Sequence, residues 1–242
     1  MRRLPVALSA VLVFGWLAVP PASAQQSLNL WVGGFVPQSK DARGTTRHGV
    51  GDDVLVNNLD CTQCFSFDIS DFNGVTVGGE WLFGMGRWLE GGLGIGLYSK
   101  TVASTYAHFV DADGSEVEQD LKLRIVPLSA TVRLLPLGHD GPVQPYVGGG
   151  VAAFAWRYSE TGEFIDFGGL KRAIVPGTFI GSGTSAGPLV LGGLRVPIGA
   201  FAVGGEVRYQ AAQGKLPADE GFAGSRIDLG GFDYLFVVNI RF

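Results

Sequence analysis

Three sets of residues in this sequence carry side chains that could do chemistry. The first is the pair Cys61 and Cys64, separated by two residues. Cysteines at this spacing can form a disulfide, exchange electrons or supply part of a zinc site. Zinc needs further ligands beyond one cysteine pair, and a redox motif needs a βαβ setting that this sequence lacks. We therefore expect a disulfide within a loop, as is usual in an oxidising compartment.

The second set is a histidine followed closely by two carboxylates. His48, Asp52 and Asp53 form the best grouping of this kind, since His108 and His139 lie far from it in the sequence. Such groups can act as general acid and base, but only when they are held in position, and spacing alone does not establish that. We expect the chain not to be an enzyme and to use no cofactor or metal ion.

The third set is a minority of charged residues that recur opposite apolar ones. If they are enclosed, charges of mixed sign must pair, because an unpaired charge away from water is unfavourable. We expect such a network from Glu80, Glu90, Arg124, Arg133, Arg195, Glu206, Arg208, Asp233 and Arg241.

The N-terminal segment predicts export. Arg2 and Arg3 precede an apolar stretch, and Ala22-Ser23-Ala24 forms a cleavage site of the small-residue type. The stretch is shorter than the roughly 20 residues that a membrane-spanning helix needs. We expect residues 1–24 to be a signal peptide and residues 25–242 to be one domain.

The elements that must position these residues are strands. Only 17% of the chain is charged, 46% is hydrophobic and 38 of its 242 residues are glycine. Apolar side chains recur at every second position, as in a strand with one apolar face. Eight strands are predicted, over residues 28–36, 73–83, 87–99, 120–135, 143–158, 187–196, 200–211 and 229–242.

The fourth and fifth segments have distinctive apolar patterns. In the fourth, Leu121 to Ile125 place apolar residues at odd positions and Val126 to Leu134 at even ones, which predicts a bulge near Ile125 and Pro127. In the fifth, Tyr146, Phe154, Trp156 and Tyr158 share one apolar face, and Arg157 lies on the other.

The predicted connections alternate between long and short, with lengths of 36, 3, 20, 7, 28, 3 and 17 residues. Long loops at one end, tight turns at the other and an even number of strands are typical of outer-membrane barrels. A soluble eight-stranded carrier would instead have an apolar cavity and a polar exterior. We therefore expect an all-β, antiparallel, up-and-down transmembrane barrel of eight strands.

The C-terminal strand carries a family resemblance through Tyr234, Phe236, Val238, Ile240 and the terminal Phe242. With this pattern the chain resembles the small eight-stranded outer-membrane β-barrel proteins of the OmpA/OmpX type. Weaker matches are residues 145–150 and 204–209. The resemblance implies that these five alternating residues are the signal read by the barrel-assembly machinery. No peptidoglycan-binding domain is expected after Phe242.

The function expected from this resemblance is structural, or the presentation of loops for adhesion or ligand binding, in a Gram-negative outer membrane. A narrow, porin-like path for small solutes or ions is the first alternative, and a rim enzyme acting on lipid or peptide is the second. The expected partners are outer-membrane lipid, lipopolysaccharide and the assembly machinery. A net charge of −4 without a basic cluster excludes nucleic acid, and a monomer is expected.

Overall fold

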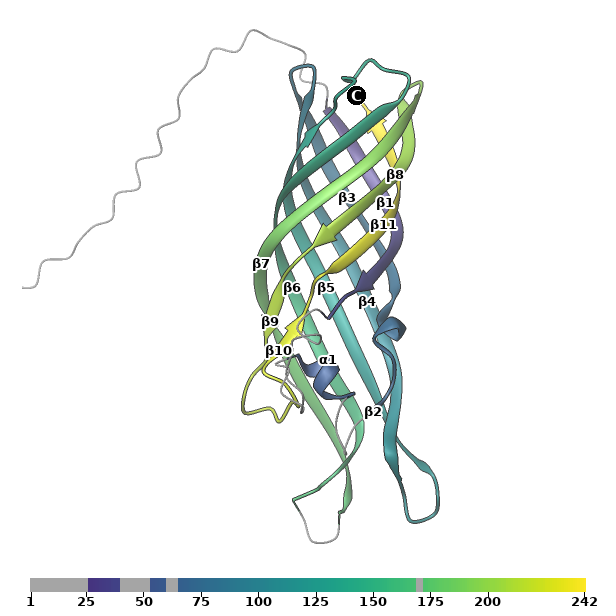
Figure 1. Ribbon diagram of the computed structural model, residues 1–242, viewed down its shortest axis with the longest axis vertical. Coiled ribbons are helices and arrows are strands. Elements are labelled where there is room, and N and C mark those ends of the chain that lie inside the picture. The colour runs from purple at the N-terminus through teal and green to yellow at the C-terminus, as the bar shows by residue number, and fades with distance from the viewer. Residues whose placement is uncertain (1–25, 40–52, 60–64, 169–171) are drawn as a thin grey trace, which may run out of the picture.

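The computed structural model describes residues 26–39, 53–59, 65–168 and 172–242, and these form a single β-barrel (Figure 1). Its wall consists of β1 (Gln26–Pro37), β3 (Gly74–Met85), β4 (Leu89–Val110), β5 (Glu116–Leu134), β6 (Gln144–Ile165), β7 (Ile174–Ile198), β8 (Phe201–Gln210) and β11 (Gly231–Arg241). The smaller elements are α1 (Val54–Asn57), β2 (Phe65–Ser66), the 3-10 helix η2 (Ile69–Phe72), β9 (Gln213–Lys215) and β10 (Arg226–Asp228).

The wall strands pair antiparallel in the order in which the chain makes them. The ring closes where β1 pairs with β3 on one side and with β11 on the other. The remaining ladders join each wall strand to the next one along the chain. The predicted eight-stranded, antiparallel, up-and-down barrel is thus confirmed.

The two ends of the barrel differ. At the turn end, where the C-terminus lies, residues 86–88, 135–143 and 199–200 connect the strands (Figure 1). At the opposite loop end, β4 to β7 run well beyond the other four strands. The prediction of long loops between these strands is wrong, because their connections are only residues 111–115 and 166–173. Hydrogen-bonded strand, with polar residues facing outward, occupies most of the sequence expected to be loop.

The outer face carries a belt of exposed apolar side chains. We call it the apolar belt, and each strand contributes to it; representative members are 41–64% exposed, namely Val32, Val77, Leu93, Leu128, Val151, Val190, Val207 and Phe236. A contiguous apolar surface of this extent marks contact with lipid or a partner.

Aromatic rings border the apolar belt. At the turn end, the rings of Trp81 and Phe242 meet edge to face with their centroids 5.3 Å apart. At the other border the rings of Tyr209 and Phe232 lie 4.9 Å apart. From Phe232 to Phe242 the strand rises about 33 Å, which a tilt of about 40° reduces to about 25 Å. That is the height of the lipid-facing band of an outer-membrane barrel.

The interior changes character along the barrel axis, and β5 shows this most clearly. Its pairing with β6 continues without a break from Gln119 to Leu134, so the predicted bulge near Ile125 and Pro127 is wrong. Instead, all odd-numbered residues of the strand face inward. Near the loop end these are buried apolar residues such as Leu121 and Leu123, whereas within the belt they are polar. The apolar residues change sides at the edge of the belt. Within the belt the outward face is apolar and the interior is polar, whereas beyond the belt the outward face is polar and the interior is apolar.

The same exchange corrects the interpretation of β6. Phe154, Trp156 and Tyr158 are buried inside the barrel, not turned toward lipid. They belong to a core at the loop end that also includes Leu55 of α1 and Ile227 of β10. The smaller elements therefore close this end of the barrel as a cap, which we define as α1, β9 and β10. No helix within the described residues is long and apolar enough to cross a membrane.

Candidate functional site

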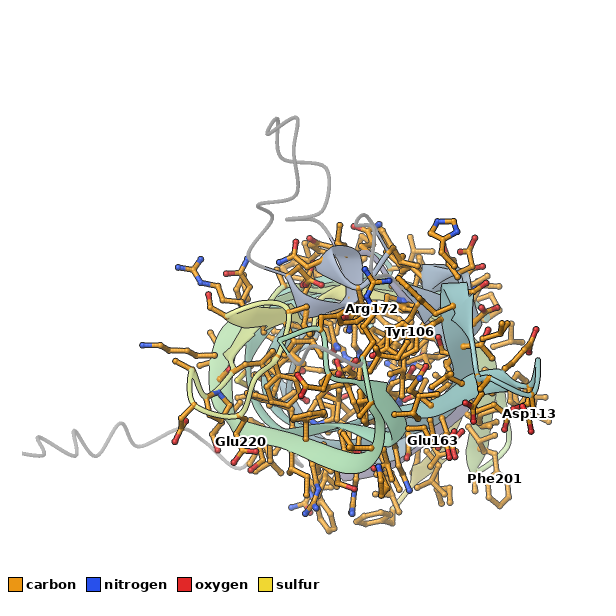
Figure 2. The ribbon with its side chains drawn as sticks, turned by 90° about the horizontal axis from the view of Figure 1, so that it is seen from below. Tyr106, Asp113, Glu163, Arg172, Phe201 and Glu220 are labelled. Atoms are coloured by element: carbon orange, nitrogen blue, oxygen red, sulfur yellow. The ribbon has the colours of Figure 1, made fainter. Side chains whose placement is uncertain are left out.

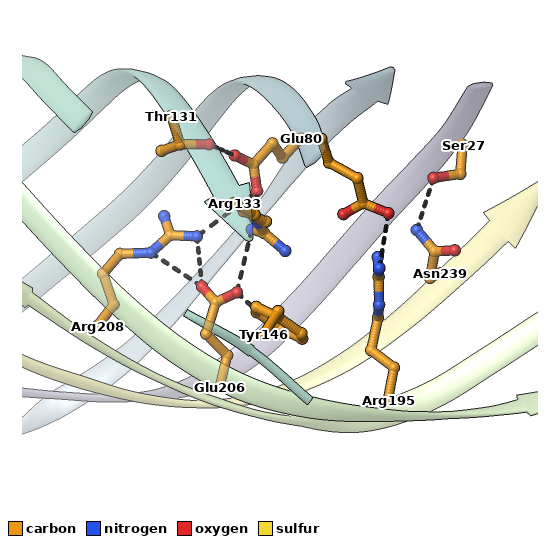
Figure 3. Close-up of polar contacts among 10 residues, drawn as sticks. Ser27, Glu80, Thr131, Arg133, Tyr146, Arg195, Glu206, Arg208 and Asn239 are labelled. Atoms are coloured by element: carbon orange, nitrogen blue, oxygen red, sulfur yellow. Dashed lines mark hydrogen bonds and ion pairs between the residues drawn. The ribbon is translucent and has the colours of Figure 1, made fainter. Parts of the chain in front are cut away.

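The barrel interior is crossed by a network of four charged side chains from three strands (Figure 3). Glu80 of β3 accepts hydrogen bonds from Arg133 and, at 2.5 Å, from the Thr131 hydroxyl, both on β5. On the opposite wall, Glu206 of β8 lies 3.0 Å from Arg133 Nη2 and 2.7 Å from Arg208 Nη2. We call Glu80, Arg133, Glu206 and Arg208 the central network; its two carboxylates balance its two guanidinium groups.

Aromatic rings complete the surroundings of these cations. The guanidinium groups of Arg133 and Arg195 lie 4.9 and 5.1 Å from the centre of the Tyr146 ring. The Tyr146 hydroxyl donates a hydrogen bond to Glu206 at 3.0 Å. Arg208 lies 4.6 Å from the ring of Trp31. Contact with a ring face stabilises a guanidinium that has lost its water, because the face of the ring is negative.

A second cluster lies closer to the turn end. Arg195 Nη2 donates to Glu90 Oε1 at 2.7 Å, and His139 Nε2 lies 3.3 Å from the same oxygen. The other ring nitrogen of His139 is 2.8 Å from the backbone oxygen of Arg87. Hydrogen bonding to Glu90 raises the pKa of His139, which lies in the turn outside the spanning segments. The lumen is therefore bridged at two levels.

Two glycines make room for these side chains. A Cβ atom at Gly92 would lie 2.3 Å from Glu80 Oε1 and 2.6 Å from the Thr131 hydroxyl. A Cβ atom at Gly193 would lie 2.4 Å from the Tyr146 hydroxyl. Both contacts are much shorter than atoms tolerate, so a larger residue at either position would displace a member of the network.

The remaining predicted lumen residues do not share this arrangement. Asp233 faces inward and lines, with Arg208, a cavity that has room for about one water molecule. Arg241 donates to Gln144 Oε1 at 2.7 Å near the turn end. The prediction that Arg124 faces the lumen is wrong, because its side chain is exposed on the outer wall. Even-numbered residues of β5 face outward, and the predicted bulge that would have turned Arg124 inward is absent.

Of the other predicted sites, the structure describes the expected assembly signal and Asp53. The C-terminal residues of the expected assembly signal are on the outward face of β11, and the two ends of that pattern, Tyr234 and Phe242, are 55% and 65% exposed. Cys61, Cys64, His48 and Asp52 lie outside the described residues. Their predicted roles stay predictions.

Asp53 is described, and it has a structural task. Its carboxylate accepts hydrogen bonds from the backbone N–H groups of Leu55, at 2.9 Å, and Asp228, at 2.6 Å. It thereby caps α1 and ties that helix to β10. Burial in the cap raises the pKa of Asp53 to about 6, and the nearby carboxylate of Asp228 adds to the effect.

A second carboxylate is buried in the same region. Glu160 Oε1 accepts hydrogen bonds from the Asn58 amide, at 2.8 Å, and the Tyr158 hydroxyl, at 2.9 Å. Burial raises the pKa of Glu160 as well. Both carboxylates hold the cap in place, since each joins elements that are far apart in the sequence.

Several participants were not found from the sequence. Thr131, Gln144 and Tyr146 have no charge to mark them, and Trp31 is like any other strand aromatic. Alternation marks only Thr131, which has the same inward-facing positions on β5 as Arg133; β1 contains no charged residue, and the charged residues of β6 begin at Arg157, far along the strand from Gln144 and Tyr146. Within the described residues, no three His, Cys, Asp or Glu side chains are grouped closely enough to hold a metal ion.

A closed eight-stranded ring with an apolar exterior and paired charges inside defines a protein of the outer-membrane β-barrel class. Solved structures agree with this. The chain is similar to the outer membrane protein OprG from Pseudomonas aeruginosa, with 11% identity and a TM-score of 0.50, over 90% of this chain and 96% of that one. At this identity the likeness shows the fold alone.

Two further barrels are more distant. Neisserial surface protein A shares 13% identity at a TM-score of 0.45, over 90% of this chain and 97% of that chain. Outer membrane protein W of E. coli shares 13% identity at a TM-score of 0.38, over 90% and 98% of the two chains. No protein-family model matches the sequence, and no curated protein matches it significantly.

Proposed function

We propose that this protein is a sealed outer-membrane barrel that anchors and presents the β-structure projecting from its loop end, without conducting solutes or catalysing a reaction. The observation that carries the proposal is the filled lumen. An eight-stranded barrel is only just wide enough to be filled by side chains. Here the central network spans the lumen within the belt (Figure 3), and an apolar core with a cap fills the space beyond it. Seen from the loop end, side chains crowd the interior of the barrel (Figure 2).

The proposed orientation places the turn end in the periplasm and the loop end outside the cell. Short periplasmic turns and longer external segments are the rule for such barrels. The projecting strands support an external position, because their outward residues beyond the belt include Glu118, Asp120, Lys122 and Glu163, all exposed to water. Export by the N-terminal signal peptide belongs to the same proposal.

A rim enzyme is disfavoured by the position of Asp53. A general base must be free to take a proton from a substrate. The two carboxylate oxygens of Asp53 instead accept backbone hydrogen bonds within the cap, and the side chain is buried. This argument concerns only the predicted cluster around Asp53.

Single-channel recording in planar lipid bilayers tests the sealed lumen. We expect no stable conductance step from the folded wild-type protein, with a known porin as the positive control in the same bilayers. Heat-modifiable mobility on a gel establishes that the sample is folded and inserted. A reproducible open channel from folded protein contradicts the proposal and supports the narrow pore.

A further inference from the structure

The outer wall of the barrel carries three cations at the edge of the apolar belt. Lys122 and Arg124 of β5 and Arg157 of β6 face outward, and we call them the basic patch. Arg124 and Arg157 are directly opposite each other in the β5–β6 ladder. Directly opposed residues have Cβ atoms about 5 Å apart, and like charges in this position repel each other.

Carboxylates within the barrel wall do not relieve this repulsion. Among the described residues, none of the three cations makes an ion pair with an acidic side chain. The nearest outward-facing acid on β5 is Asp120, two residues beyond Lys122 and about 7 Å farther along the strand. The side chains opposite Lys122 and Arg124 on the other flank are the neutral Thr101 and Ser99 of β4.

The cations surround a hollow on the protein surface. Its lining consists of Leu97, Ser99, Lys122, Arg124, Arg157 and Ser159. Guanidinium groups bind phosphate oxygens in a two-pronged geometry, lysine adds a point charge, and serine hydroxyls can donate hydrogen bonds. Leu97, which is 40% exposed, supplies an apolar border on the side of the belt.

The height of the basic patch identifies what it meets. Arg124 is ten residues from Leu134, the last residue of β5 at the turn end. This corresponds to about 33 Å along the strand and, at a tilt of about 40°, to about 25 Å across the bilayer. The patch therefore lies where hydrocarbon gives way to lipid headgroups, and Val126 and Leu128 precede it within the belt.

We propose that the basic patch binds the phosphorylated sugar headgroup of an outer-leaflet glycolipid, with the acyl chains of the lipid lying along the apolar belt below. The proposal rests on the outer-membrane location and orientation of the proposed function, but not on the sealed lumen. Three features together identify this ligand. Its phosphates would contact the cations, its sugar hydroxyls would contact Ser99 and Ser159, and its acyl chains would contact Leu97 and the belt.

The test is a binding titration with diphosphoryl lipid A, using the full-length folded protein in detergent micelles at low ionic strength. The variant Lys122→Gln/Arg124→Gln/Arg157→Gln removes the patch. A basic residue near an anionic lipid surface contributes about a fivefold change in affinity. We thus expect roughly 100-fold weaker binding by the triple variant, and progressively weaker wild-type binding as salt is added.

Matched controls separate the patch from general charge effects. Arg87→Gln/Lys215→Gln removes two exposed cations at the turn end and in the cap, and it should bind lipid A within twofold of wild type. Monophosphoryl lipid A should bind more weakly than the diphosphoryl form, and inorganic phosphate should not compete at equal concentration.

Three outcomes overturn the proposal: equal lipid A affinity of the folded triple variant and wild type, equal losses in the control variant, or competition by inorganic phosphate as strong as that by lipid A. All variants must first show heat-modifiable mobility. Because conductance is not measured, these results are independent of whether the lumen proves sealed.

Discussion

At the scale of the residue, the barrel depends on charges that are enclosed and mutually neutralised. Arg133 is central because it contacts both Glu80 and Glu206, and its side chain is fully buried. Breaking a buried ion pair by removing one partner typically destabilises a protein by about 3–5 kcal/mol, since the other charge is left uncompensated. Removing both partners of a pair is much less harmful.

This asymmetry gives a double-mutant prediction. We expect Arg133→Met to lower the free energy of unfolding by about 3–5 kcal/mol. The double variant Glu80→Leu/Arg133→Met keeps the Glu206–Arg208 pair, whose atoms are 2.7 Å apart, and should be more stable than the single variant. Urea unfolding in lipid vesicles, followed by tryptophan fluorescence, measures both variants and the single variant Glu80→Leu. If the double variant loses the sum of the two single losses, Glu80 and Arg133 do not stabilise each other.

The cap should respond to pH through Asp53. Its pKa in the folded state is about 6, above the ordinary value of 3.8, so the folded cap holds this proton more tightly than the open chain does. The stabilisation is therefore complete below about pH 4 and is lost as the pH rises through about 6. This stabilisation amounts to about 3 kcal/mol in the free energy of opening the cap, when opening exposes the Asp53 carboxylate to water.

Hydrogen-exchange protection of the α1 and β10 amides, compared between pH 4 and pH 7, measures this effect. Asp53→Asn keeps a hydrogen-bond acceptor but cannot ionise, so its protection should depend less on pH than that of wild type. Part of the dependence should persist through Glu160, whose pKa is also raised by burial. An unchanged pH dependence in Asp53→Asn would show that another group is responsible.

The residue scale also shows where sequence reasoning succeeds and fails. The outward face of β11 could be predicted because its apolar residues alternate over the whole strand. The burial of Phe154 and Trp156 could not, since an aromatic residue at alternate positions looks the same whether it faces lipid or a protein core. Arg124 is misplaced for the same reason: a charged residue in a barrel strand can face the enclosed lumen or, beyond the belt, the water outside, and alternation alone does not distinguish the two.

At the scale of the element, each long strand crosses two environments. β5 illustrates the consequence: its outward face is apolar from Val126 to Leu134 and polar from Glu116 to Arg124. Its inward face has the reverse order, and the register with β6 stays constant throughout. A single strand thus carries the pattern of a membrane barrel in one half and of a soluble barrel in the other.

One substitution placed in each half of β5 tests this view. Leu128→Arg introduces a charge on the outward face near the middle of the belt, between Arg124 and Leu134, and should destabilise the folded barrel by about 2–4 kcal/mol. Asp120→Arg introduces the same residue on the same face beyond the belt, and should change stability by no more than about 0.5 kcal/mol. Equal losses in urea unfolding from lipid vesicles would mean that both positions lie in one environment.

At the scale of the whole molecule, the protein is a barrel closed by its own side chains and extended on one side. The central network and the cluster around Glu90 bridge the lumen within the belt, while the cap covers the core at the loop end. The alternation of long and short connections predicted the correct ring of strands. The predicted loops between β4 and β7 are too long, because the polar outward residues of the projecting strands resemble those of irregular loops.

The central claim is that the apolar belt faces hydrocarbon and that the polar minority inside it is enclosed. Nitroxide scanning along β5 tests this most directly, with labels at single introduced cysteines in a protein whose Cys61 and Cys64 are replaced by serine. In lipid vesicles, labels at Leu128 and Val132 should collide with oxygen, a label at Lys122 with a water-soluble nickel chelate, and a label at Thr131 with neither. Access of the nickel chelate to positions 128 and 132 would contradict the account.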